Sequence, residues 1–196
     1  MRSVMLSASR YCFAARATQV IGSPAAERSS ARFLSERRPA LAVLCLYATP
    51  ERQAALDDFY RRYDGDPLVI DKWFALQAVI PEPETLDRVR MLTAHSAFSL
   101  ANPNRVRALV GNFVQANQTQ FNRADGAGYA FHADTMIALD AINPQVAARL
   151  MTAFRSWRAL EPERSNRAES ELKRIAAAAS LSRNVHDIVT RTLGTA

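Results

Sequence analysis

The sequence predicts an all-α protein, a superhelical stack of antiparallel helix pairs of the HEAT or armadillo kind. Apolar residues recur at intervals of three or four along most of the chain, as on the buried face of a helix. The dipeptide Asn-Pro, a strong helix start, occurs at Asn102-Pro103 and again 41 residues later at Asn143-Pro144. With 48% hydrophobic residues and only 6 Gly among 196 residues, the chain can bury one sizeable core.

Two helices and a turn are expected between residues 40 and 67. Residues 40–47 are an apolar run that fits a buried helix. The motif Thr-Pro-Glu at residues 49–51 is typical of a helix start, because it offers an N-cap hydroxyl, a proline at the first helical position and an acidic first turn. This second helix should run to Tyr63, where Asp-Gly-Asp-Pro at residues 64–67 interrupts it.

Two further helices are expected before the first Asn-Pro motif. The longer one should end at Pro81, and the shorter one follows with apolar residues at positions 86, 89 and 92. Trp73 and Phe74 lie on the longer helix and are expected to be core and interface anchors rather than a stacking platform.

Each Asn-Pro motif should begin a helix. The Asn side chain accepts hydrogen bonds from first-turn amides that have no other partner, and proline has no amide hydrogen to satisfy. Apolar residues then follow at matching positions, since Leu109 corresponds to Leu150 and Phe113 to Phe154. A period near forty is that of HEAT and armadillo helix pairs, which bury their apolar faces by stacking on one another.

The segment Ala-Asp-Gly-Ala-Gly-Tyr at residues 124–129 is expected to be a loop. It lacks the glycine spacing, the lysine and the preceding strand of a phosphate-binding turn. Two last helices are expected around residues 163–178 and 183–193. Ser182 fits an N-cap for the final helix and Gly194 fits its C-terminal stop.

Basic residues are concentrated at the start of the chain. The net charge of +6 raises the question of nucleic-acid binding. Residues 1–50 hold seven Arg and two Glu, which leaves 18 basic and 17 acidic residues in the remainder. That remainder is nearly neutral and has no Lys/Arg stripe with interleaved aromatics, so no nucleic-acid partner is expected. No apolar run approaches the length of a membrane span, so no membrane partner is expected either.

Residues 1–38 stand apart as an atypical basic segment, expected to be disordered or unlike the helical domain at residues 39–196. Three interpretations remain open. Residues 1–26 contain three Arg and no acidic residue, as in an organelle transit peptide. A secretory signal fits less well, because no long apolar core follows the basic start. The favoured interpretation is an altered or misassigned gene start that joins the domain near Arg38.

Several motifs follow one another from residue 66 to the end. Residues 66–107 read DPLVIDKWFALQAVIPEPETLDRVRMLTAHSAFSLANPNRVR, and the strings ADGAGYAFHAD, LDAINPQVAARL and LSRNVHDIVTRTL come after them. This order of motifs resembles the C-terminal domain of aminopeptidase N, the bacterial alanyl aminopeptidase family of the zinc-dependent gluzincin class. The resemblance extends from about Leu41 to the end, and it implies a superhelical stack of helix pairs.

The zinc site of that family is not encoded in this chain. Such a site needs His-Glu-x-x-His on one helix face, where two imidazoles hold the metal beside a glutamate base. His95, His132 and His186 all lack this spacing, and the substrate-amine motif Gly-x-Met-Glu-Asn is absent as well. The resemblance therefore implies a fragment of the enzyme or a stand-alone relative of its last domain. No cofactor, no metal ligand and no catalytic residue is expected in this chain, which should not hydrolyse peptides by itself.

The resemblance also implies residues that contact substrate. Arg107 lies at the edge of the apolar stripe of its helix, and Gln145 and Arg149 share one face at a four-residue spacing. Taken alone, each arginine fits a solvated or ion-paired surface group. In aminopeptidase N the concave side of this domain closes over the zinc chamber, and the matching side chains face peptide carbonyls or a terminal carboxylate. The predicted channel residues are therefore Arg107, Gln145 and Arg149, with Arg105 as a lesser candidate.

Other polar pairs fit structural roles. Asp57 and Asp58 are adjacent on a helix and face different ways, which makes them a poor acid/base pair. His186 and Asp187 fit a pair on a helix surface. No Gly-x-Ser-x-Gly elbow supports a hydrolase triad.

The predicted function is the non-catalytic substrate-channel domain of a zinc-dependent alanyl aminopeptidase, which in its intact form removes N-terminal residues from peptides. The alternative is a stand-alone helical-repeat scaffold that binds a peptide or protein partner on its concave face. Expected partners are peptides in the intact enzyme, and either the catalytic domains or a second copy at the exposed N-terminal face. A cytoplasmic location is expected from the resemblance, or an organelle if residues 1–26 are a transit peptide.

Overall fold

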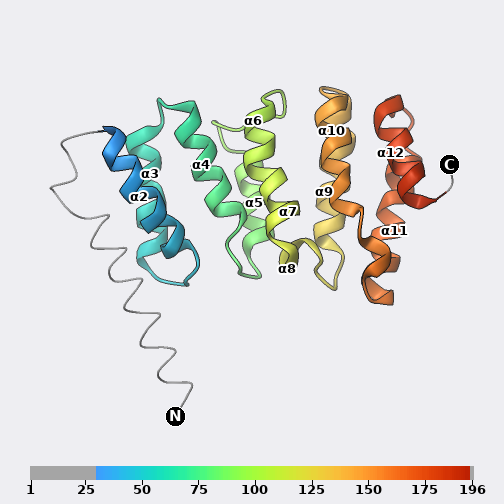
Figure 1. Ribbon diagram of the computed structural model, residues 1–196, viewed down its shortest axis with the longest axis horizontal. Coiled ribbons are helices and arrows are strands. Elements are labelled where there is room, and N and C mark those ends of the chain that lie inside the picture. Colours follow the sequence, from blue (N-terminus) through green and yellow to red (C-terminus); the bar gives the residue numbers. More distant parts are fainter. Residues whose placement is uncertain (1–29, 195–196) are drawn as a thin grey trace, which may run out of the picture. The chain divides into compact units, whose positions relative to one another are not determined.

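The computed structural model describes residues 30–194, with side chains from residue 38 onward, and every regular element in this range is a helix (Figure 1). The all-α prediction is thereby confirmed. The chain divides into two compact units, residues 1–80 and 81–196. The atypical segment expected at residues 1–38 lies mostly outside the described residues, and its boundary with residue 39 falls within a helix that begins at Ser30.

The described part of the first unit contains three mutually contacting helices: α2 (Ser30–Cys45), α3 (Glu51–Tyr63) and α4 (Pro67–Ala78). Leu44, Leu56 and Phe74 are fully buried among them. Trp73 is a core anchor as predicted, because only 5% of it is exposed and its indole N–H donates to the carbonyl of Leu56 at 2.9 Å. The core of this unit is therefore mainly apolar, and the indole N–H within it has a hydrogen-bond acceptor.

The helix starts of the first unit differ in part from the prediction. Pro50 precedes α3 instead of occupying its first helical position, and the buried Thr49 hydroxyl has no hydrogen-bond partner in the described residues. At α4 the Asp66 carboxylate accepts hydrogen bonds from two backbone N–H groups, and Pro67 takes the first helical position. The turn at residues 64–67 thus ends one helix and also starts the next.

The second unit consists of helices joined by short loops: α5 (Thr85–Thr93), α6 (Pro103–Val106), the π turn η2 (Arg107–Gly111), α7 (Asn112–Ala116), α8 (Gln118–Phe121), α9 (Ala127–Asp140), α10 (Pro144–Leu150), the 3-10 turns η3 (Met151–Phe154) and η4 (Trp157–Ala159), α11 (Pro162–Ala176) and α12 (Arg183–Leu193). α9 packs against α10 and α11 packs against α12, which gives two successive helix pairs. The pairs stack through contacts of α9 with α11 and of α10 with α12. No helix in the described residues has both the length and the apolar character needed to cross a membrane.

Both Asn-Pro motifs begin helices as predicted. The side chains of Asn102 and Asn143 accept hydrogen bonds from backbone N–H groups in the first turns of α6 and α10. In Figure 1 both helices begin at the upper edge of the unit. The matching apolar residues are all at most 3% exposed: Leu109, Phe113, Leu150 and Phe154. The two segments therefore bury equivalent stripes.

The predicted loop at residues 124–129 is wrong in its second half, because α9 begins at Ala127. Gly126 makes the turn with φ of 75°, a left-handed conformation that glycine adopts without steric cost. Gly128 lies inside α9 and is packed against the backbone of Phe121 and Gln120. The two glycines thus mark a tight turn and a close approach of two backbones.

The last two helices match their predictions within three residues at each end. Ser182 caps α12, since its hydroxyl accepts from the N–H of Val185, and Gly194 ends the helix with φ of 68°. Asp140, only 4% exposed, accepts from the N–H of Ser182 at 2.6 Å and from its hydroxyl at 2.5 Å. This buried carboxylate ties the end of α9 to the start of α12.

Candidate functional site

The predicted channel residues lie directly after α6 and on α10, and all three are exposed. Arg107 follows α6 directly, and its Nη1 donates to Asn104 Oδ1 at 3.1 Å. Gln145 and Arg149 lie one turn apart on α10. Among residues 38–194, neither arginine forms an ion pair with a carboxylate. No acid of the described residues neutralises either guanidinium, so each can still donate hydrogen bonds to a ligand.

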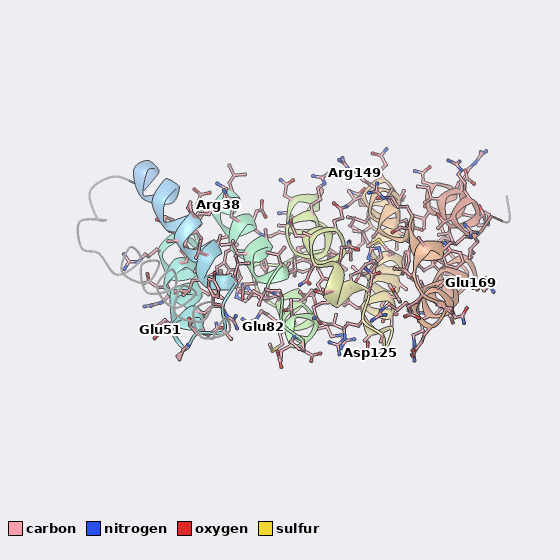
Figure 2. The ribbon with its side chains drawn as sticks, turned by 60° about the horizontal axis from the view of Figure 1, so that its bottom comes forward. Arg38, Glu51, Glu82, Asp125, Arg149 and Glu169 are labelled. Carbon is pink, nitrogen blue, oxygen red and sulfur yellow. The ribbon has the colours of Figure 1, made fainter. Side chains whose placement is uncertain are left out.

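Many other arginines of the second unit are paired with acids. The pairs are Arg90–Asp87, Arg123–Asp125, Arg164–Glu161, Arg167–Glu163 and Arg174 with Asp134 and Glu171. At Asp125, hydrogen bonds from the Arg123 side chain and from the N–H of Ala127 lower the pKa of the carboxyl. Figure 2 shows Asp125 and Arg149 at opposite edges of the unit. The paired cluster at Asp125 and the unpaired Arg149 therefore belong to different edges.

The two segments that carry the candidate arginines touch at Gly111. A Cβ atom placed on Gly111 would lie 3.4 Å from Leu150 Cδ2 and 3.8 Å from the Cβ of Arg107. Arg107 thus borders the contact from one segment, and Arg149 precedes Leu150 on the other. This contact brings the two arginine-bearing segments together, whereas a shared groove for their side chains remains a prediction.

A π turn separates α6 from α7 at the candidate site. It spans Arg107–Gly111, so Arg107 is its first residue. The side-chain amide of Asn112 donates to the carbonyls of Arg107 at 3.2 Å and of Ala108 at 2.9 Å. These bonds satisfy carbonyl groups at the point where the regular α-helical pattern is interrupted.

Arg105, the lesser candidate, has a different environment. It is 8% exposed, and its Nε donates to the carbonyl of Ala97 at 2.9 Å. The side chain thereby fixes the loop between α5 and α6, whereas Arg107, two residues later, is exposed. Any role of Arg105 in binding a peptide remains a prediction.

A pocket of about 610 Å³ lies elsewhere in the second unit, between the end of α5, the following loop and α9. Its lining combines apolar and polar side chains: Arg90, Thr93, Phe98, Ser99, Leu100, Phe131, Asp134, Thr135 and Ala138. None of the four predicted residues contributes to it. Its acidic member, Asp134, is already held by Arg174 at 2.7 Å. The pocket and the predicted channel residues are therefore separate features.

The residues that the structure describes do not fit a zinc site. Within the described range, no group of three or more His, Cys, Asp or Glu could hold a metal ion. His132 is completely buried on α9, and its Nε2 lies 3.2 Å from the carbonyl of Leu150. That nitrogen carries the proton, because a carbonyl can only accept a hydrogen bond. Burial lowers the pKa of His132 to about 4, so the ring is a neutral core group.

We expect the purified full chain to retain no stoichiometric zinc and to leave an alanyl amide substrate uncleaved. The reason is the sequence itself, which has no pair of histidines at metal-binding spacing beside a glutamate base. Metal content by mass spectrometry and release of the amine would check this, with a full-length aminopeptidase N as the positive control. One zinc ion per chain together with turnover would contradict the expectation.

Two residues near the site were missed by sequence reasoning, Asn104 and Asn112. Asn104 follows the first Asn-Pro motif as Gln145 follows the second, 41 residues later, and this match was visible in the sequence. Asn112 was also detectable, because the polar positions step by five residues from Arg107 to Asn112. A five-residue step is the spacing of a π turn rather than of an α-helix.

Comparisons with known proteins agree in one family. A family model described as a domain of unknown function (DUF3458_C) with ARM repeats matches residues 1–194, which includes the segment 1–38. The chain is 44% identical over 143 residues to aminopeptidase N of Caulobacter vibrioides and 34% identical over 165 residues to aminopeptidase N of Haemophilus influenzae. These alignments cover 73% and 84% of this chain.

A solved structure is similar as well, that of Legionella pneumophila aminopeptidase A in complex with aspartic acid. It matches 83% of this chain with a TM-score of 0.78 and 35% identity. The matches cover only 17% and 19% of the two curated relatives and 19% of the solved chain. The chain thus spans less than a fifth of the proteins that it resembles.

Proposed function

Because the chain belongs to the DUF3458_C family, the ARM-repeat C-terminal domain of aminopeptidase N-like enzymes, we propose that it is the substrate-channel domain of a zinc-dependent alanyl aminopeptidase. In this role it cleaves nothing itself. Its side chains bind the part of a peptide that extends beyond the scissile bond, while zinc chemistry belongs to other domains of the intact enzyme. The catalytic domains are then its partners, and peptides are its ligands.

The observation that supports this role is that two arginines are exposed and have no acidic partner among the described residues. Arg107 and Arg149 are exposed, lack a carboxylate partner among the described residues, and come from segments that touch at Gly111. Guanidinium groups present several N–H donors in a planar fork that suits carboxylates. Gln145 adds an amide one turn from Arg149. Together these groups offer donors to peptide carbonyls and to a terminal carboxylate.

A role in binding rather than in folding predicts little effect on stability. We expect Arg107→Ala and Arg149→Ala to change the free energy of unfolding by no more than about 0.5 kcal/mol, the usual range for exposed side chains. Arg105→Ala should destabilise by roughly 1–3 kcal/mol, because it removes a buried side chain that is bonded to the Ala97 carbonyl. Urea denaturation of the full chain measures all three. A large loss for Arg107→Ala or Arg149→Ala would assign that arginine to packing.

The proposed function is tested in a hybrid enzyme in which this chain replaces the matching segment of Caulobacter vibrioides aminopeptidase N. Its substrates are tri-alanine and an alanyl amide that has no second residue. Arg107→Ala and Arg149→Ala should each raise the KM for tri-alanine roughly tenfold, since a charge-assisted hydrogen bond is worth about 1–3 kcal/mol. The KM for the alanyl amide should stay unchanged.

The matched control is Arg191→Ala, which removes an exposed arginine of α12. It should leave both substrates unaffected. If the KM for tri-alanine is the same in every variant, the channel role is wrong, and a helical-repeat scaffold for another partner becomes the better account.

A further inference from the structure

The solvent-facing polar positions of the α6–α7 segment follow an unusual spacing. They are the exposed Asn104, Arg107 and Gln115 and the half-buried Asn112, with steps of three, five and three residues. Exposed positions on one face of an α-helix recur every three or four residues. The five-residue step coincides with the π turn at Arg107–Gly111.

These four polar positions form a solvent-facing strip. The π turn determines which residue between Asn104 and Asn112 lies on it. In an uninterrupted α-helix, Ala108 would lie one turn before Asn112 and share its solvent-facing side, and Arg107 would lie about 140° from Asn112 around the helix axis. In the structure Ala108 is 8% exposed, whereas Arg107 is exposed. The extra residue of the π turn thus exchanges a buried alanine for an arginine on this strip.

Side chains on both sides hold Arg107 in this arrangement. The Asn112 amide donates to the carbonyls of Arg107 and Ala108, which fixes the backbone of the π turn. Asn104, one turn before, accepts from Arg107 Nη1 at 3.1 Å. Asn favours non-helical sites, so these bonds give each residue a local role within a helical segment.

The choice of an amide at position 104 also affects charge. A carboxylate there would neutralise the guanidinium, as Asp125 does for Arg123. The uncharged Asn104 orients Arg107 and leaves its positive charge available, while the Asn104 Nδ2 remains a second kind of donor. An orientation fixed before binding reduces the entropy lost when a ligand is bound.

We propose that Asn104 and Asn112 are positioning residues for Arg107. Asn112 holds the π turn that brings Arg107 to the solvent-facing strip, and Asn104 orients the guanidinium toward a peptide carbonyl or terminal carboxylate. The binding role of this pair rests on the proposed function. The positioning itself is a property of the chain alone, and the two are tested separately.

The first experiment uses no ligand. In the full chain, the ¹⁵N heteronuclear NOE of Arg107 Nε should report a more restricted side chain than that of Arg191 Nε on α12. Asn104→Ala and Asn112→Ala should each lower the Arg107 value to the level of Arg191, while Asn104→Asp, which keeps the acceptor oxygen, should retain it. Asn166→Ala, at an exposed position of α11, is the matched control and should change nothing. If Arg107 is already as mobile as Arg191, or stays restricted in both alanine variants, the proposal is overturned.

The second experiment measures binding of tri-alanine to the full chain by NMR titration. Arg107→Ala should weaken binding roughly tenfold, and Asn112→Ala should weaken it by a comparable factor. The double variant should be no weaker than Arg107→Ala alone, because a positioning residue acts only through the arginine. Additive losses would overturn the positioning role and leave the channel role intact. An effect of Asn104→Ala and Asn112→Ala on the NOE without any effect of Arg107→Ala on binding would instead reject the channel role alone.

Discussion

Gly128→Ala is expected to destabilise the second unit by about 3 kcal/mol. A Cβ atom at this position would collide with the carbonyl oxygen of Phe121 and lie 2.7 Å from that of Gln120. Both contacts are with backbone atoms, which cannot turn aside as a flexible side chain would. The start of α9 would have to move away from α8 and disturb the aromatic cluster in which Phe121 packs edge-on against Tyr129.

The matched control for this prediction is Gly65→Ala in the turn between α3 and α4. No atom lies within 4 Å of a Cβ placed there, and the φ of Gly65 is not positive. This variant should be neutral or more stable by up to about 1 kcal/mol, since alanine restricts the unfolded chain. Thermal or urea unfolding of both variants makes the comparison. Equal stability of the two variants would show that the close approach of α8 and α9 is not a constraint.

Acidification should destabilise the chain through His132. Burial lowers its pKa from the usual 6.5 to about 4, and the pKa in the unfolded chain should be near 6.5. Between about pH 6.5 and pH 4, His132 is therefore protonated in the unfolded chain and stays neutral in the folded chain. The contribution of this residue is present above pH 6.5 and is lost as the pH falls toward 4, in total roughly 3 kcal/mol.

The environment of His132 explains the size of this effect. Its Nε2–H donates a hydrogen bond to the Leu150 carbonyl, and its Nδ1 is buried with no hydrogen-bond partner in the described residues. Protonation would place a charged N–H beside the rings of Phe121 and Phe154. His132→Gln, which keeps a donor and does not titrate, should remove this part of the pH dependence.

Other groups also titrate in this range, so the measured quantity is the difference between variant and wild type in the free energy of unfolding from pH 7 to pH 4. An identical pH dependence of His132→Gln and wild type would contradict the role assigned to His132.

Helix starts with a local chemical signal could be predicted from the sequence. Asn102, Asn143 and Ser182 cap helices as expected, because capping depends on one side chain and the amides that directly follow it. The repeat of the Asn-Pro motif also predicted the pairing of helices, which the ARM-repeat family match supports. Each of these signals depends only on residues that lie close together in the sequence.

Features that depend on distant neighbours could not be predicted in the same way. The start of α9 was predicted wrongly because two glycines suggested a loop, although Gly128 is required by the backbone of another helix. Likewise, nothing near Asp140 in the sequence indicates that its buried carboxylate binds Ser182 on α12. Both are tertiary contacts between segments that the chain brings together only on folding.

The residues of the candidate site also differ in how far their environment could be predicted from the sequence. Arg107, Gln145 and Arg149 were chosen by resemblance, and their exposure could be anticipated from their place beside an apolar stripe. The burial of Arg105 could not, because it depends on the loop carbonyl of Ala97. The π turn could be predicted only in part. Its five-residue step is present in the sequence, but the segment was expected to follow α-helical spacing.

The central claim is that the side chains of Arg107, Gln145 and Arg149 bind peptide. It is tested most directly by an NMR titration of the full chain with tri-alanine and with its C-terminal amide. The account predicts that the side-chain signals of Arg107, Gln145 and Arg149 shift together, and that the amide form, which lacks the terminal carboxylate, binds more weakly. Shifts confined to the pocket lined by Phe98 and Phe131, with the three polar side chains unaffected, would contradict it.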